Sequence, residues 1–98
     1  MPVYIQLLKF TDQGIKTIKE APARAATNIK ATDALPGYKV HGFYYLLGEY
    51  DALLVVEAPD DNAAMLVSLI RSLKGNVRTT TIKAFTIDQF EEIVKQLP

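Results

Sequence analysis

The sequence predicts an α+β fold of the ferredoxin-like type: a four-stranded antiparallel sheet with two main helices on one face and a further helix at the C-terminal end. The first observation is the order of the apolar patterns, which reads strand, helix, strand, strand, helix, strand, helix along the 98 residues. The second is the run from Ala52 to Val56, in which every position is apolar. A hairpin strand normally alternates apolar and polar residues, so we expect both sheet faces to be covered, one by helices and the other by a second copy of the chain.

The composition excludes several kinds of function. Lysine plus arginine and aspartate plus glutamate number 11 each, so no net charge favours nucleic acid or anionic lipid as a partner. The chain has no cysteine, which excludes disulfides, thiolate nucleophiles and cysteine-bound zinc. The apolar stretch from Val3 to Leu8 is too short for a signal peptide or a membrane span. We therefore expect one cytoplasmic domain over residues 1–98, with no cofactor, no metal and no membrane partner.

The first third of the chain is predicted to be a strand followed by a helix. Residues 3–10 have the alternating pattern of a strand. Residues 11–14 (Thr-Asp-Gln-Gly) are capping and turn residues that are expected to separate this strand from a helix over residues 15–34. Pro22 should kink or restart that helix, and Pro36-Gly37 should end it.

A hairpin is predicted next, with strands over 39–47 and 50–58. Gly48-Glu49 suits a two-residue type II′ turn, because glycine stands first. That turn would pair Leu47 with Tyr50, Tyr45 with Ala52, and Phe43 with Leu54. The set expected to face the helices is His41, Phe43, Tyr45, Ala52, Leu54 and Val56. The set expected to face away from them is Val40, Gly42, Tyr44, Asp51, Leu53, Val55 and Glu57. A single bulge would exchange the two sets.

The last third is predicted to be helix, strand and helix. Residues 59–62 (Pro-Asp-Asp-Asn) are typical of a helix start, and Gly75-Asn76 of a helix end. The buried stripe of this helix is expected to be Ala63, Leu66, Val67, Ile70 and Leu73. A threonine-rich strand is predicted over 77–85. Thr86-Ile87-Asp88 can then cap a final helix, whose apolar face would be Phe90, Ile93, Val94 and Leu97.

Three segments carry a resemblance to a known family. Residues 43–51 (Phe-Tyr-Tyr-Leu-Leu-Gly-Glu-Tyr-Asp), 3–5 (Val-Tyr-Ile) and 75–79 (Gly-Asn-Val-Arg-Thr) resemble the GYD-domain family, a group of small proteins, largely of unknown function, within the dimeric α/β-barrel superfamily. The eponymous tripeptide is present in residues 48–51 with a glutamate inserted after the glycine. The resemblance spans nearly the whole chain and implies a dimer. The fold alone implies no activity, because it hosts many.

A second resemblance concerns the effector-binding domains of leucine-responsive-type regulators. They have a similar Gly-Glu-Tyr-Asp turn before an aliphatic strand, and residues 76–80 are similar to the step before their last strand. These 98 residues contain no helix-turn-helix, so the resemblance implies a stand-alone version of such a module. Some proteins of the superfamily bind haem, which here would require His41 to lie in a cleft.

Two of the candidate ligand-binding residues can be read in more than one way. Asp51 is either a carboxylate at the mouth of a cleft or an acceptor for backbone amides beside the turn. His41 is the sole histidine, and without a second nitrogen or sulfur ligand we expect no zinc, copper or iron site. As a general base His41 would need an orienting partner that the sequence does not locate. No catalytic residue is therefore assigned.

The remaining candidates are aromatic, amide and cationic side chains. Tyr44 and Tyr50 belong to a group of five tyrosines that suits a subunit interface or a pocket wall. Gln6 is a polar residue inside the first predicted strand. Arg78 can hold a carboxylate through two N–H groups, or it can pair with an acid of the protein.

These residues favour a homo-oligomeric protein that binds or senses a small molecule and is not an enzyme. The oligomer is expected to be a homodimer or a higher assembly. The ligand is expected to be a small organic acid or amino acid near the turn at 48–51, with Arg78 as its anion partner. The alternative is a cofactor-independent enzyme of the same architecture, of the monooxygenase or isomerase type, that would use Gln6, Tyr44, Asp51 and His41. A third possibility is a purely structural interaction module.

Overall fold

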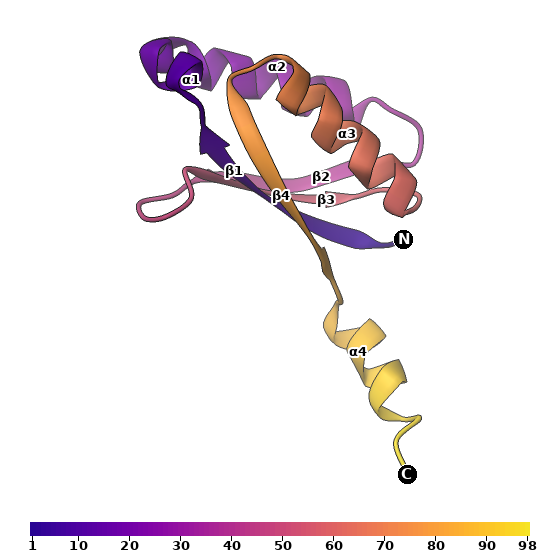
Figure 1. Cartoon of the computed structure of the whole chain (residues 1–98). Helices are drawn as coiled ribbons and strands as arrows, with labels where there is room; N and C mark the ends of the chain where they lie inside the picture. The colour runs from indigo at the N-terminus through magenta and orange to yellow at the C-terminus, as the bar shows by residue number, and fades with distance from the viewer.

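The computed structural model describes residues 1–98 and confirms the predicted order of elements and the four-stranded antiparallel sheet. The strands are β1 (Val3–Phe10), β2 (Lys39–Tyr45), β3 (Ala52–Glu57) and β4 (Val77–Ala84), and the helices are α1 (Asp12–Lys16), α2 (Ala21–Asp33), α3 (Asp61–Leu73) and α4 (Ile87–Val94). The strand order is β2-β3-β1-β4. Helices α1 to α3 lie on one side of the sheet, as predicted, while α4 extends away from the body (Figure 1). No helix is both long enough and apolar enough to cross a lipid bilayer.

The first connection is more broken than the single helix expected over 15–34. Thr11 accepts a hydrogen bond from the Gly14 amide (3.1 Å), and this N-cap starts α1 at Asp12. Thr11 is thus a capping residue, as predicted, but the helix begins at Asp12 and not at the predicted residue 15. A 3-10 turn at Ile18–Glu20 separates α1 from α2. Pro22 lies in the first turn of α2, where a missing N–H costs nothing, so its role as a restart is confirmed.

The hairpin pairs Tyr45 with Ala52 and Phe43 with Leu54, as predicted. The strands stop at these positions, however, and residues 46–51 form a longer loop than the two-residue turn. The Asp51 amide donates to the Leu8 carbonyl (2.8 Å), and the Asp51 carbonyl accepts from the Leu46 amide (2.9 Å). These bonds close the hairpin one step earlier than a pairing of residues 47 and 50 would.

A β-bulge between Val40 and Gly42 changes the assignment of faces in β2. Val40 lies opposite Val56 and packs against the core, whereas it was expected to face away from the helices. His41 bonds to the Glu57 carboxylate (2.6 Å) on the other face, so its predicted position facing the helices is wrong. Between the bulge and the hairpin loop, Phe43, Tyr44 and Tyr45 lie on the sheet faces that were predicted for them. Because a bulge adds one residue to one strand, the residues before it face opposite sides from those expected for an unbroken alternation.

The core lies between the sheet and the helices, and α3 covers it with small side chains. The central buried cluster is Tyr4, Leu8, Ala52, Leu54, Val56, Ala58 and Ala64. The buried residues of α3 are Ala64, Val67, Ser68 and Arg71. The predicted stripe is therefore wrong at Leu66, Ile70 and Leu73, which are exposed. Asp60 caps α3 by accepting from the Ala63 amide (2.8 Å), which confirms the predicted helix start, and the small residues Ala64 and Ser68 are among those that face the sheet.

Besides the exposed outer side of α3, two apolar surfaces have no cover within one chain. The sheet face away from the helices consists of Val3, Ile5, Leu7, Tyr44, Leu53, Val55 and Ile82, and we call it the open face. Tyr44 is 63% exposed there and Ile82 47%. Helix α4 is capped by Thr86, as expected, through a capping box; its apolar residues Phe90, Ile93 and Val94 are exposed, as is Leu97, which lies beyond the end of the helix.

Candidate functional site

A cavity of about 50 Å³ lies between helices α2 and α3 and the helix-covered face of the sheet. Eight of its 13 lining residues are apolar, among them Leu8, Phe43, Tyr45 and Ala52. The polar lining residues are Arg24, Asn28, Arg71, Lys74 and Asn76. Three of these are cationic and none is acidic. We call this space the arginine cavity, and its lining favours an anion with apolar atoms.

Arg71 is the most unusual residue of the cavity, because it is a buried cation without an acidic partner. It lies on the inner face of α3 and is 7% exposed. Its Nη2 donates to Thr32 Oγ1 (3.1 Å), while its buried Nε has no acceptor in the protein. Burial lowers the pKa of the Arg71 guanidinium, since removal from water disfavours the charged form. The site therefore holds a positive charge that the protein itself does not balance.

Arg24 brings a second guanidinium to the cavity from α2. Its Nη1 donates to the carbonyl (3.0 Å) and the hydroxyl (2.9 Å) of Thr17, which fixes the side chain. Glu20 lies 3.7 Å from the same Nη1 but is largely exposed. The Nη2 atom of Arg24 is buried and has no acceptor in the protein. Burial raises the pKa of the nearby Tyr45 hydroxyl, and the charge of Arg24 opposes that shift.

Lys74 and the two asparagines complete the polar side of the arginine cavity. Lys74 Nζ donates to Asn28 Oδ1 (2.6 Å), which holds the ammonium near the mouth between α2 and α3. Asn76 Oδ1 accepts from Gln13 Nε2 (3.0 Å) and belongs to the turn that leads from α3 to β4. None of the lining groups is a carboxylate, an imidazole or a thiol. The arrangement can therefore hold and orient an anion, and the side chains in it that are able to transfer a proton or act as nucleophiles are Tyr45 and Lys74.

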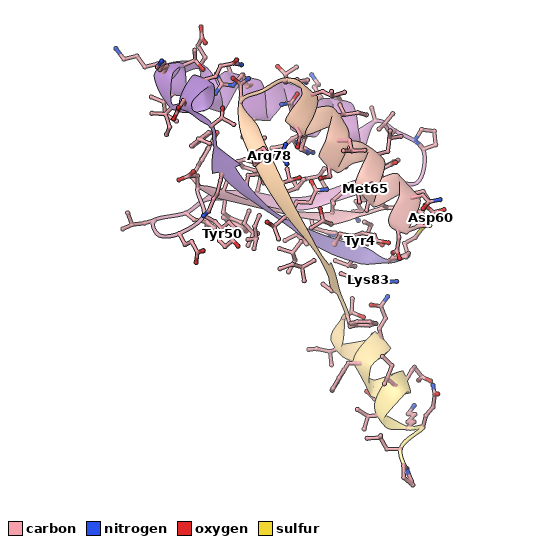
Figure 2. The ribbon with its side chains drawn as sticks, viewed as in Figure 1. Tyr4, Tyr50, Asp60, Met65, Arg78 and Lys83 are labelled. Carbon is pink, nitrogen blue, oxygen red and sulfur yellow. The ribbon has the colours of Figure 1, made fainter.

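A second, more open groove of about 470 Å³ runs between α3 and the edge strand β4. Tyr4 donates to Asp61 Oδ1 (2.5 Å) at one end, where Lys83 lies 3.4 Å from the same oxygen. Burial and this hydrogen bond raise the pKa of Tyr4 to about 12, and the Tyr4 hydrogen bond, helped by Lys83, lowers the pKa of Asp61. Arg78 lies at the other end of the groove, toward the start of β4 (Figure 2).

The structure divides the six candidate residues among three places. Gln6 is fully buried beneath α3, where its Nε2 lies 3.4 Å from the Ala64 carbonyl and its Oε1 has no partner. His41 and Tyr44 belong to the open face, where His41 bonds to Glu57. The other three, Tyr50, Asp51 and Arg78, lie toward one end of the sheet.

At that end β1 separates the turn from Arg78. Asp51 Oδ2 accepts from the Phe10 amide (2.8 Å), as in its structural interpretation. Lys9 is the cross-strand neighbour of Arg78, and its ammonium lies 5.2 Å from the centre of the Tyr50 ring. Tyr50 and Arg78 are thus linked through Lys9 and do not line one pocket. Figure 2 shows Tyr50 on the side of the hairpin loop and Arg78 beside α3.

The residues of the arginine cavity were not singled out from the sequence. The one available signal was the spacing of Ala64, Val67 and Arg71, which places an arginine on the buried stripe of α3 once the phase of that helix is known. Arg24 gave no such signal, because its contacts depend on the break between α1 and α2.

Comparisons with known proteins agree on the family and the fold. The GYD domain matches residues 4–94 of this chain. The chain is 32% identical over 87 residues to the glutamine synthetase and cystathionine beta-lyase binding protein of Thermus thermophilus, covering 89% of this chain and 92% of that protein. The crystal structure of TTHA0845 from Thermus thermophilus superposes with a TM-score of 0.55 at 24% identity, over 88% of this chain and 95% of that one. The latter similarity concerns the fold alone.

Proposed function

The chain belongs to the GYD domain family, and from this starting point we propose that it is a homo-oligomeric protein that binds or senses a small molecule in the arginine cavity. The observation that carries the proposal is the buried guanidinium of Arg71, whose Nε faces no acceptor of the protein. Burying an unpaired charge costs several kcal/mol (on the order of 3–5 when a partner is removed), so such a group is expected where it is used.

The cavity lining favours binding without turnover, because it includes no carboxylate or imidazole, and burial raises the pKa of its Tyr45 hydroxyl. The cofactor-independent enzyme considered as an alternative would need a group that accepts or donates a proton at the bound molecule. Its four candidate residues do not line the arginine cavity, and they are divided between the interior, the open face and the hairpin loop. A binding or sensing role needs no such group.

The homo-oligomer is supported by two of the uncovered apolar surfaces, the open face and the apolar side of α4. The open face carries seven apolar or aromatic side chains, and α4 presents its apolar residues to solvent beyond the edge of the body (Figure 1). Contiguous apolar patches beyond a few hundred Å² are rare on soluble monomers. A second copy has a matching open face of the same size, and an isologous contact would cover both at once.

A second candidate function is the binding of another protein. The outer face of α3 exposes five large apolar residues: Met65, Leu66, Leu69, Ile70 and Leu73. The related Thermus protein is named for binding two enzymes, glutamine synthetase and cystathionine beta-lyase. If this chain also contacts a protein, the α3 outer face offers an apolar surface that the second copy on the open face leaves free.

One pair of measurements tests the proposed function. Sedimentation equilibrium at micromolar concentration should give at least twice the 10.9 kDa of one chain. A thermal-shift screen of small metabolites should find a ligand that raises Tm in the wild type and not in Arg71→Met, since ligand binding to the folded state stabilises it. A monomer mass, or a screen in which no compound raises Tm through Arg71, contradicts the proposal.

A further inference from the structure

Resting on the proposed ligand-binding role, we propose that the arginine cavity takes a small monocarboxylate with a short apolar tail, whose carboxylate pairs with Arg71 and Arg24. Each guanidinium offers a buried nitrogen without an acceptor in the protein, Nε of Arg71 and Nη2 of Arg24. Both residues line the same cavity. A carboxylate has two oxygens and can accept from two guanidinium groups, and charge-assisted hydrogen bonds of this kind are about twice as strong as neutral ones.

The charge balance of the cavity selects an anion. Arg24, Arg71 and Lys74 line it, and no acidic residue does. Arg71 has no ion pair at all, and Glu20, the one acid near Arg24, is largely exposed to solvent. A ligand with one negative charge would offset the free-energy cost of burying the Arg71 guanidinium. A neutral or cationic ligand would leave that charge without a partner.

The size and the walls of the cavity select a short tail. Its volume of about 50 Å³ is several times the roughly 10–15 Å³ that one ordered water needs, which corresponds to roughly four water-sized positions. That is enough for a carboxylate and a short aliphatic chain and too small for a nucleotide or a sugar phosphate. Leu8, Phe43 and Ala52 supply apolar surface for such a tail. Phosphate or sulfate would place further hydrated oxygens against that surface, which is unfavourable.

The test is calorimetry with the full chain against acetate, propionate, butyrate and pyruvate, with phosphate, sulfate and chloride as inorganic anions at equal ionic strength. Propionate or a homologue should bind saturably and more tightly than any inorganic anion. Arg71→Met should weaken that binding roughly 10- to 150-fold, the equivalent of a charge-assisted hydrogen bond of about 1.5–3 kcal/mol. Lys30→Met, which removes a positive charge from the exposed side of α2, should leave the affinity within about twofold.

Several outcomes overturn the inference. One is the absence of saturable carboxylate binding up to about 10 mM, a range in which weak ligands of this size are still detected. Another is equal affinity in the wild type and in Arg71→Met, or tighter binding of phosphate than of any carboxylate. If Arg71→Met fails to fold by circular dichroism, Arg24→Met takes its place with the same expectation. A neutral compound that raises Tm through Arg71 while carboxylates fail overturns this inference alone, whereas failure of every compound overturns the proposed function as well.

Discussion

Arg71 Nη2 donates a 3.1 Å hydrogen bond to Thr32 Oγ1, and this bond joins α3 to α2 in the interior of the protein. Thr32 is itself satisfied without the arginine, because its hydroxyl donates to the Asn28 carbonyl (2.9 Å). The main effect of the bond is therefore to position the guanidinium, because the threonine hydroxyl already has a partner. Nε of Arg71 is buried and has no acceptor in the protein, and the Arg71 side chain lines the arginine cavity.

The first prediction is that Arg71→Met does not destabilise the fold. Methionine keeps the length and much of the volume of the side chain, removes the buried charge and leaves Thr32 bonded to Asn28. Replacing buried charge by well-packed apolar atoms is often neutral or stabilising by about 1–4 kcal/mol. Urea unfolding in a buffer without carboxylate should show an unchanged or higher free energy of unfolding. A loss of more than about 2 kcal/mol would mean that the guanidinium is a structural member of the core.

The second prediction concerns the open face. Leu53 is half-buried there and lies opposite Leu7 and Tyr44 on the neighbouring strands. Leu53→Lys should raise the dissociation constant of the oligomer roughly tenfold or more, because a lysine at the centre of an apolar interface is desolvated without a partner. Sedimentation velocity over a concentration series measures this. Ala23→Lys, at an exposed position of α2, is the control and should not change the constant.

The third prediction is an alkaline titration that belongs to Tyr4. Its folded-state pKa is raised from 10.0 to about 12, first by burial and then by the hydrogen bond to Asp61. The neutral form is thus favoured in the folded state. The resulting stability is fully present below pH 10 and is lost as the pH rises toward 12, since the unfolded chain gives up the proton first.

Absorbance at 295 nm measures this titration directly. One of the five tyrosines should ionise near pH 12 in the folded protein, and this component should be missing in Tyr4→Phe. Asp61→Asn removes the negative charge beside the hydroxyl and should move the same component to lower pH. A wild-type titration without a component near pH 12 would contradict both the burial of the Tyr4 hydroxyl and its hydrogen bond to Asp61.

The fourth prediction concerns the close approach of α1 to the turn between α3 and β4. A Cβ atom on Gly14 would lie 2.1 Å from the Asn76 carbonyl oxygen, which also accepts from the Thr11 amide (3.0 Å). Gly14→Ala should therefore lower the free energy of unfolding by about 1–3 kcal/mol, the usual cost of overpacking. Lys16→Ala on the exposed side of the same helix is the control, with an expected change within about 0.5 kcal/mol. Equal urea midpoints for the two variants would contradict this packing.

The order of elements could be predicted from the sequence because it depends on local residue patterns. The first strand at 3–10, the proline at the start of α2 and the threonine cap of α4 all appear as expected. What it missed depends on contacts across the fold. The bulge that moves His41 to the open face is set by the pairing of β2 with β3. The side of α3 that is buried is set by its packing on the sheet, where Ala64 belongs to the core, and this packing also buries Arg71.

The candidate site illustrates the same limit. Gln6, Asp51 and Arg78 were chosen for their chemistry, but one is buried beneath α3, one bonds to the backbone of β1 and one lies in a separate groove. The arginine cavity is made by residues from α2, α3 and the sheet that are far apart in the chain. Such a convergence follows from tertiary packing, and no local pattern encodes it.

The most direct test of the account is the Nε–H signal of Arg71 in a nitrogen-edited NMR spectrum of the full chain. The protein has three arginines, Arg24, Arg71 and Arg78, so three such signals are expected, and that of Arg71 is identified by its absence in Arg71→Met. On titration with propionate, the Arg71 signal should move saturably while that of Arg78 stays in place. An unmoved Arg71 signal, or movement of the Arg78 signal alone, would contradict the assignment of the arginine cavity as the ligand site.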